Sequence, residues 1–405
     1  MNTNPTQSLK EKGSLISEFQ SDNIQKDFYP IAGKPFNIDK ITLEQIDNLK
    51  INYIFTTGRS ASTLLGVMLM MSEEVIFCLE EIFPIILKQK YSKIKQWTEQ
   101  IIKEYCDDFV LMSEGKLYPL FCGKDVLYEL LIRFKEHLNY ERAIRISYLS
   151  FGINKDLSKI TTIVDKQLRY YLSHHYLELF PSAKILLLVR DPRDNVYSKY
   201  NRAIRKKIKT DVCLYIHTWK IAFEKYISII NQYKNQHIVI QFEELINNPN
   251  ETLTNICQFI GIHYTNDFFK FYEVTQKFFN NISHPTLKEH FDITHKSLTR
   301  PLTPQKVNEW KNKFHQSDIA GIINSCWTIC KNIAKLFNYT DHDGYTSQSI
   351  QCLKTILRIK WNEIMPHIFF NIIPYSIKRK IKQKKYPYRI NSPSAYDKFL
   401  RKGYL

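Results

Sequence analysis

The sequence predicts a three-layer α/β fold in which helices cover both faces of a mainly parallel central sheet. Short apolar runs that are typical of strands alternate with longer segments whose apolar residues recur every three or four positions, as in helices. The apolar residues within 184–189 are continuous, which is typical of a strand buried on both faces in a parallel sheet. With 405 residues, of which 44% are apolar, the chain is long enough to build such a core.

The first predicted strand leads into a helix through a turn of small residues. Within residues 51–81, an apolar run at 53–55 is followed by a turn at 56–63 and by an apolar helix at 64–71. Such a turn aims backbone N–H groups and the positive end of a helix dipole at one point, as phosphate and sulfate sites do. We therefore expect a P-loop-like fold with an anion site at this turn.

The turn departs from the loop of nucleotide hydrolases. That loop, GxxxxGK[ST], needs a second glycine and a lysine before its hydroxyl residue, whereas this chain has only Gly58 followed by Ser62 and Thr63. ATP or GTP hydrolysis is therefore disfavoured. Ala61 would be unstrained in a helical conformation but strained if the turn requires a positive φ there.

The other elements follow in a regular βα order. A short helix is expected to open at Thr42, which suits an N-cap. Strands are expected at 75–79, 160–164, 184–189 and 237–241, and helical periodicity dominates 82–150. Further helices are expected from Asp191, with Asp194 in the capping-box position, around 219–233, and over 251–260, the last ended by Gly261.

Charged residues stand at the ends of four predicted strands, namely Arg59, Glu80, Lys166 and Arg190. In an open parallel sheet the site lies beyond the carboxyl ends of the strands. Three cations and one carboxylate suit the transfer of a charged group from an anionic donor to a hydroxyl. The cations offset charge on the leaving phosphate, and the carboxylate accepts the proton of the hydroxyl. No Asp-rich metal motif is seen, so we expect no metal requirement.

Two motifs, in this order, resemble those of sulfotransferases. RSAST at 59–63 is similar to the family's sulfate-side loop, which usually has Gly where this chain has Ala61. KILLLVRDPRDNVYSKYNR at 184–202 is similar to the second hallmark, an apolar strand followed by Arg and, eight positions later, Ser. The nearest branch is the protein-tyrosine sulfotransferases and their bacterial relatives. It is matched over about residues 50–340 by VIFCLEE, IVDKQL, TWKIAFEKY, FEELINNPNETLTNICQFIGI and TRPLTPQKVNEWKNKF.

The resemblance implies a donor, 3′-phosphoadenosine 5′-phosphosulfate (PAPS), and a product, 3′-phosphoadenosine 5′-phosphate (PAP). It implies that Glu80 is the general base and that Arg59 and Lys166 are catalytic cations, although a shift of one residue would exchange Glu80 for Glu81. The donor-binding residues that it implies are Arg59, Ser60, Ala61, Ser62, Thr63, Leu64, Arg190, Ser198, Thr294 and Arg300. A tyrosine, a carbohydrate hydroxyl and a small metabolite all stay open as acceptors.

Two other functions stay open on the residues alone. A nucleotide-dependent kinase of the same fold is disfavoured by the missing GK[ST] and metal-binding acid. A non-catalytic protein that binds anions or membranes would keep the loop but would not need Glu80.

The charge of the chain is concentrated at its C-terminal end. Of the formal net charge of +17, residues 351–405 contribute +11, from 13 Lys and Arg against two acids. We divide the chain into a polar extension (1–40), a sulfotransferase-like domain (41–345) and a basic amphipathic tail (346–405). The tail is expected either to cap the core or to contact an anionic membrane or a polyanionic acceptor. Specific nucleic-acid binding is disfavoured because no recognisable binding module is present.

Cysteine usage and hydropathy indicate the cellular compartment of the protein. The eight cysteines form no CxxC pair, so neither a disulfide framework nor a zinc site is expected. Residues 1–30 lack the apolar core of a signal peptide, and no apolar run is long enough to span a bilayer. These features favour a cytoplasmic protein, with peripheral membrane contact through the tail as the alternative.

Overall fold

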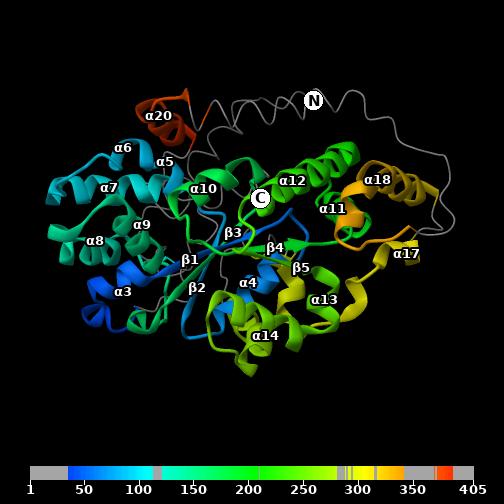
Figure 1. The fold of residues 1–405 in the computed structure, drawn as a ribbon, viewed down its shortest axis with the longest axis horizontal. Coiled ribbons are helices and arrows are strands. Elements are labelled where there is room, and N and C mark those ends of the chain that lie inside the picture. The colour runs from blue at the N-terminus through cyan, green and yellow to red at the C-terminus, as the bar shows by residue number, and fades with distance from the viewer. Residues whose placement is uncertain are drawn as a thin grey trace, which may run out of the picture.

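The predicted α/β class is confirmed by a single parallel sheet at the centre of the molecule (Figure 1). The computed structural model describes residues 35–112, 121–208, 210–280, 288, 291–292, 295–313, 317–341, 369 and 372–385. The strands are β1 (Lys50–Phe55), β2 (Val75–Leu79), β3 (Thr162–Gln167), β4 (Ile185–Val189) and β5 (His237–Gln241). They lie in the order β2-β3-β1-β4-β5, and every neighbouring pair is parallel. The carboxyl ends of all five strands therefore meet at one edge of the sheet.

Alternate residues of the strands pack into two separate hydrophobic clusters, one on each face of the sheet. Ile54 and Leu186 belong to the first cluster, whereas Phe55 and Leu187 belong to the second. The first face is covered by α4 (Ser62–Met70), α13 (Phe242–Asn247) and α14 (Pro249–Ile260). This arrangement gives the helix–sheet–helix layers that the sequence predicts.

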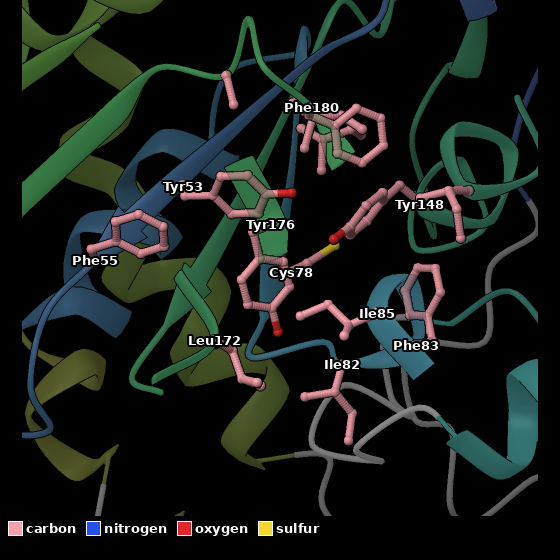
Figure 2. Packing of buried hydrophobic residues seen from close by; sticks show 14 of the residues in the cluster. Tyr53, Phe55, Cys78, Ile82, Phe83, Ile85, Tyr148, Leu172, Tyr176 and Phe180 are labelled. Atoms are coloured by element: carbon pink, nitrogen blue, oxygen red, sulfur yellow. The ribbon is translucent and has the colours of Figure 1, made fainter. Parts of the chain in front are cut away.

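The second face carries the larger helical layer. Its helices include α5 (Phe83–Ile86), α6 (Lys88–Tyr91), α7 (Glu99–Met112), α8 (Lys124–Arg133), α9 (Tyr140–Leu149), α10 (Ser173–Leu179), α11 (Pro192–Arg205), α12 (Val212–Gln232) and α18 (Ser317–Leu336). Aromatic rings fill the space between this layer and the sheet (Figure 2). Tyr53 packs against Tyr176 with ring centroids 5.2 Å apart, and Phe83 packs against Tyr148 at 5.1 Å.

Helix α4 lies unusually close to strand β2. A Cβ atom at Gly66 would stand 2.0 Å from the ring of Phe77, far inside van der Waals contact. Glycine is therefore required at this position for the helix that follows the loop to reach the sheet.

Two predicted helix ends are confirmed, and one predicted cap is wrong. The hydroxyl of Thr42 accepts a hydrogen bond from the N–H of Gln45 at 3.1 Å, and Gly261 ends α14 with a left-handed φ of 73°. Asp194 makes no capping box, because its Oδ1 instead accepts a hydrogen bond from the N–H of Trp310 at 2.9 Å.

Strand β3 lies two to three residues beyond the run at 160–164 that the sequence predicts. Asp165 and Lys166 consequently stand inside the strand rather than after it. A buried carboxylate is tolerated there because Oδ2 of Asp165 accepts hydrogen bonds from Tyr148 Oη and Gln167 Nε2, each at 2.9 Å.

One cysteine departs from the prediction that no disulfides form. Cys213, in the first turn of α12, is disulfide-bonded, whereas Cys78, Cys326 and Cys330 are buried free thiols. None of the helices in the described part of the chain is long and apolar enough to cross a bilayer.

Candidate functional site

Three non-glycine residues with left-handed backbone conformations flank the carboxyl ends of β1 and β2. Arg59 has φ 73°, Ala61 has φ 61° and Glu80 has φ 63°. Such conformations cost on the order of 1–3 kcal/mol each and persist where the surrounding structure enforces them. Arg59 and Ala61 shape the loop between β1 and α4. The left-handed φ of Glu80 turns the chain at the end of β2.

The loop between β1 and α4 is held by a residue that the sequence motifs did not single out. Nδ2 of Asn195, on α11, donates to the carbonyl oxygen of Gly58 at 3.0 Å and contacts Oγ of Ser60 at 2.9 Å. Ser60 and Ser62 are buried. The loop is therefore fixed by α11 as well as by its own helix.

The two sequence motifs meet at Arg59. Its Nε donates a hydrogen bond to Oγ of Ser198 at 3.2 Å, across 139 residues of sequence. Nη1 of Arg190 donates to the carbonyl oxygen of Arg59 at 3.1 Å. The loop, the end of β4 and helix α11 thus form one continuous site.

Glu80 and Lys166 form a buried ion pair beside this loop. Lys166 Nζ lies 3.0 Å from Glu80 Oε1, and the side chains of Lys166 and Glu80 are 8% and 7% exposed. Lys166 Nζ also donates to Oγ1 of Thr63 at 3.3 Å, so Lys166 connects the carboxylate to the first turn of α4. Nη1 of Arg169 donates to the carbonyl oxygen of Glu80 at 3.0 Å and supports its left-handed backbone.

Glu81 has different surroundings from Glu80. Its carbonyl oxygen accepts hydrogen bonds from Gln167 Nε2 at 3.1 Å and from Tyr176 Oη at 2.8 Å. These bonds tie Glu81 to the core behind the sheet edge. The carboxylate of Glu80 pairs with Lys166 beside the loop, and the backbone of Glu81 is tied to the core.

The site concentrates positive charge. Burial, together with the positive charges of Arg202, Arg190 and Arg205, lowers the pKa of Arg59 to about 10. Arg202 lies one helical turn beyond Ser198 on α11, and burial lowers its pKa as well. Its helical spacing from Ser198 is the signal that could have identified it. A cluster of like charges at one sheet edge is suited to a ligand with several negative charges.

Helix α12 braces the strand ends from one side. Trp219 Nε1 donates to the carbonyl oxygen of Arg190 at 3.2 Å, and Tyr226 Oη donates to the carbonyl oxygen of Thr56 at 3.0 Å. The segment TWKIAFEKY therefore holds the backbone at the carboxyl ends of β1 and β4.

The late tryptophan segment also contacts Arg190. Arg190 Nη2 donates to the carbonyl oxygen of Lys306 at 2.6 Å. Trp310, on α17 (Glu309–Lys313), is fully buried and stacks on the guanidinium of Arg193 at 4.1 Å. The late segment thus contacts the site through Lys306 and Trp310, both within the matched run TRPLTPQKVNEWKNKF.

The remaining predicted donor-binding residues have varied placements. Leu64, in α4, is partly buried and packs against the first hydrophobic cluster. Arg300 is exposed at the C-terminal end of η7 (Lys296–Thr299). Thr294 lies outside the described residues.

Comparison with known proteins gives consistent matches. The model of a family described as "Sulfotransferase family" matches residues 53–266, which is more than half of the chain. A curated 3-beta-hydroxysteroid sulfotransferase of Cavia porcellus is 25% identical over 187 residues, covering 41% of this chain and 65% of that protein. The chain therefore matches less than two thirds of the length of this relative.

Two solved structures that match the chain are named as sulfotransferase domains. The domain from the Synechococcus PCC 7002 olefin synthase is 16% identical, covers 73% of this chain and 97% of its own, and has a TM-score of 0.42. The domain from the curacin biosynthetic pathway is 16% identical, with coverages of 72% and 98% and a TM-score of 0.46.

Proposed function

The chain belongs to the sulfotransferase family, and we propose that it moves a sulfuryl group from PAPS to an acceptor hydroxyl and releases PAP. The observation that carries this proposal is the hydrogen bond between Arg59 and Ser198. It joins the loop after β1 to the helix after β4, so the two parts of a donor site that lie far apart in the sequence form one surface.

The chemistry of the residues fits this donor. PAPS carries phosphate groups and a sulfate, and the site offers a partly buried Arg59 whose charged form is disfavoured by burial and by neighbouring arginines. An anion would relieve both costs. Arg190 and Ser198 would hold the 3′-phosphate, while Arg59, Thr63 and the N-terminus of α4 would hold the sulfate side.

The chain's own residues supply the acid–base chemistry. The positive charge of Lys166, 3.0 Å from Oε1, favours the carboxylate form of Glu80 and restricts its orientation. A carboxylate in that position can accept the proton of an acceptor hydroxyl as the hydroxyl oxygen attacks sulfur. When bound, the donor supplies the activated sulfuryl group.

The acceptor is proposed only as a hydroxyl compound, with a tyrosine, a carbohydrate and a small metabolite as the classes to compare. The guinea-pig relative is named for a hydroxysteroid. Acceptor choice depends on loops and helices that differ between members of one fold.

Thermal unfolding with PAP, compared with ATP and magnesium, tests the donor. PAP at about 100 times its dissociation constant should stabilise the protein by about 2.7 kcal/mol. Arg190→Ala should weaken PAP binding more than Ser198→Ala, because a charge-assisted hydrogen bond is roughly twice as strong as a neutral one. Stabilisation by ATP with magnesium and none by PAP would favour a kinase and contradict the proposal.

A further inference from the structure

Helix α20 (Tyr375–Lys385) is attached to the core through polar contacts. It lies beside α6 and α7 at the periphery of the molecule (Figure 1). Arg379 Nε donates to Oδ1 of the buried Asp108 at 2.8 Å, while Lys90 Nζ lies 2.9 Å from the other oxygen of the same carboxylate. Lys378 is fully buried and donates to Oε1 of Gln89 at 2.9 Å.

Apolar side chains of α20 face solvent. Ile377 and Ile381, one helical turn apart, are 47% and 42% exposed, and Ile372, just before the helix, is 64% exposed. An ordinary surface helix turns its apolar side inward and its charged side outward. In α20, Lys378 and Arg379 contact the core beside the aromatic ring of Tyr375, whereas Ile377 and Ile381 are exposed.

The exposed apolar side is combined with a high density of positive charge. Six of the eleven residues of α20 are Lys or Arg, and none is acidic. Apolar side chains on a helix rich in Lys and Arg suit the interface of a bilayer that contains anionic lipids. A symmetric contact with a second copy is disfavoured, because it would place like charges against each other.

We propose that α20 is a lipid-binding helix, whose exposed isoleucines insert among the headgroups of an anionic phospholipid surface while the exposed Lys380 contacts a phosphate. The charged contacts to Asp108 and Gln89 hold the helix so that this side stays outward. The surface does not include the sulfotransferase site, so the inference is independent of the proposed activity.

Co-sedimentation of the full chain with vesicles tests the proposal. The parent protein should bind phosphatidylglycerol vesicles and not phosphatidylcholine vesicles, and added salt should weaken the binding. Ile377→Ser combined with Ile381→Ser should lower the partition coefficient at least about tenfold, which corresponds to about 1.4 kcal/mol of lost apolar burial. Lys380→Gln should lower it about fivefold, which corresponds to about 1 kcal/mol.

A matched control removes exposed apolar side chains elsewhere. Val274→Ser with Leu336→Ser, on α15 (Phe271–Asn280) and α18, changes residues that are 40% and 66% exposed and should leave vesicle binding unchanged. All variants should melt like the parent, because the altered side chains are exposed. The proposal is overturned if the parent fails to bind phosphatidylglycerol vesicles or if the α20 variants bind as well as the parent. A parent dimer that these variants convert to a monomer would instead identify a second copy as the occupant.

Discussion

At the scale of single residues, the backbone gives the adjacent residues Glu80 and Glu81 different contacts. The left-handed φ of Glu80 turns the chain at the end of β2, so that Glu80 meets Lys166 while the carbonyl of Glu81 is tied to Gln167 and Tyr176. A positive φ at a glutamate is uncommon and cannot be read from sequence spacing. The sequence therefore left the choice between the two carboxylates open.

We expect Glu80→Gln to keep donor binding and to lose sulfuryl transfer. Glutamine has nearly the same shape but cannot accept the proton of the acceptor, and loss of a general base typically costs about 10² to 10⁴ in rate. Calorimetry with PAP and single-turnover transfer from PAPS measure the two properties separately.

Glu81→Gln is the matched control and should retain transfer, because the carboxylate that pairs with Lys166 is that of Glu80. An inactive Glu81→Gln next to an active Glu80→Gln would reverse the assignment. Two active variants would remove the carboxylate base from the proposed mechanism.

At the scale of elements, the sequence predicted the strands better than it predicted the conformation of the loop between β1 and α4. The runs at 75–79 and 237–241 are β2 and β5 without change. The third strand was misplaced because Asp165 and Lys166 look like loop residues. Hydrogen bonds from Tyr148, on α9, and from Gln167 satisfy this carboxyl group inside the sheet.

The loop itself contains a conformation that its sequence does not favour. Ala61 occupies φ 61°, ψ 19° immediately before α4, where sulfotransferases usually have glycine. We expect Ala61→Gly to raise the free energy of unfolding by about 1 kcal/mol, because glycine adopts this conformation without the steric cost of a Cβ atom. Urea denaturation measures the change.

Ala143→Gly, in α9, provides the opposite case for comparison. Ala143 is buried in a helix, where glycine costs roughly 1 kcal/mol relative to alanine. If both substitutions destabilise the protein equally, the left-handed conformation at Ala61 carries no strain.

At the scale of the whole molecule, the site depends on residues that converge from distant parts of the chain. The motifs identified Arg59, Lys166, Arg190 and Ser198, which the structure brings to one sheet edge. They did not identify Asn195, whose role is to hold the loop from another helix. Contacts between separate elements have no local signature, so they could not be predicted from one sequence.

Behind this edge, Asp165 is buried between the sheet and the helical layer, where Tyr148 reaches it from α9. Burial is the main cause that raises the pKa of Asp165 to about 7; the nearby Glu80 acts in the same direction, and the hydrogen bonds from Tyr148 and Gln167 oppose it. The folded protein therefore holds a proton that the unfolded chain releases near pH 4. The stability that this group contributes should be complete below about pH 4 and lost as the pH rises towards about 7.

We expect Asp165→Asn to reduce this pH dependence, because asparagine stays neutral throughout the range. As the pH rises from about 5 to about 8, the free energy of unfolding of the parent should fall by on the order of 1 kcal/mol or more, and that of the variant should fall less. Urea denaturation at each pH measures both. Asp47→Asn serves as a control, because the pKa of Asp47 is shifted in the opposite direction. A hydrogen bond from Arg142 lowers the pKa of Asp47, so its contribution is lost only as the pH falls into the acid range. Parallel pH profiles for the parent and Asp165→Asn would mean that Asp165 is already ionised in the folded protein at about pH 5.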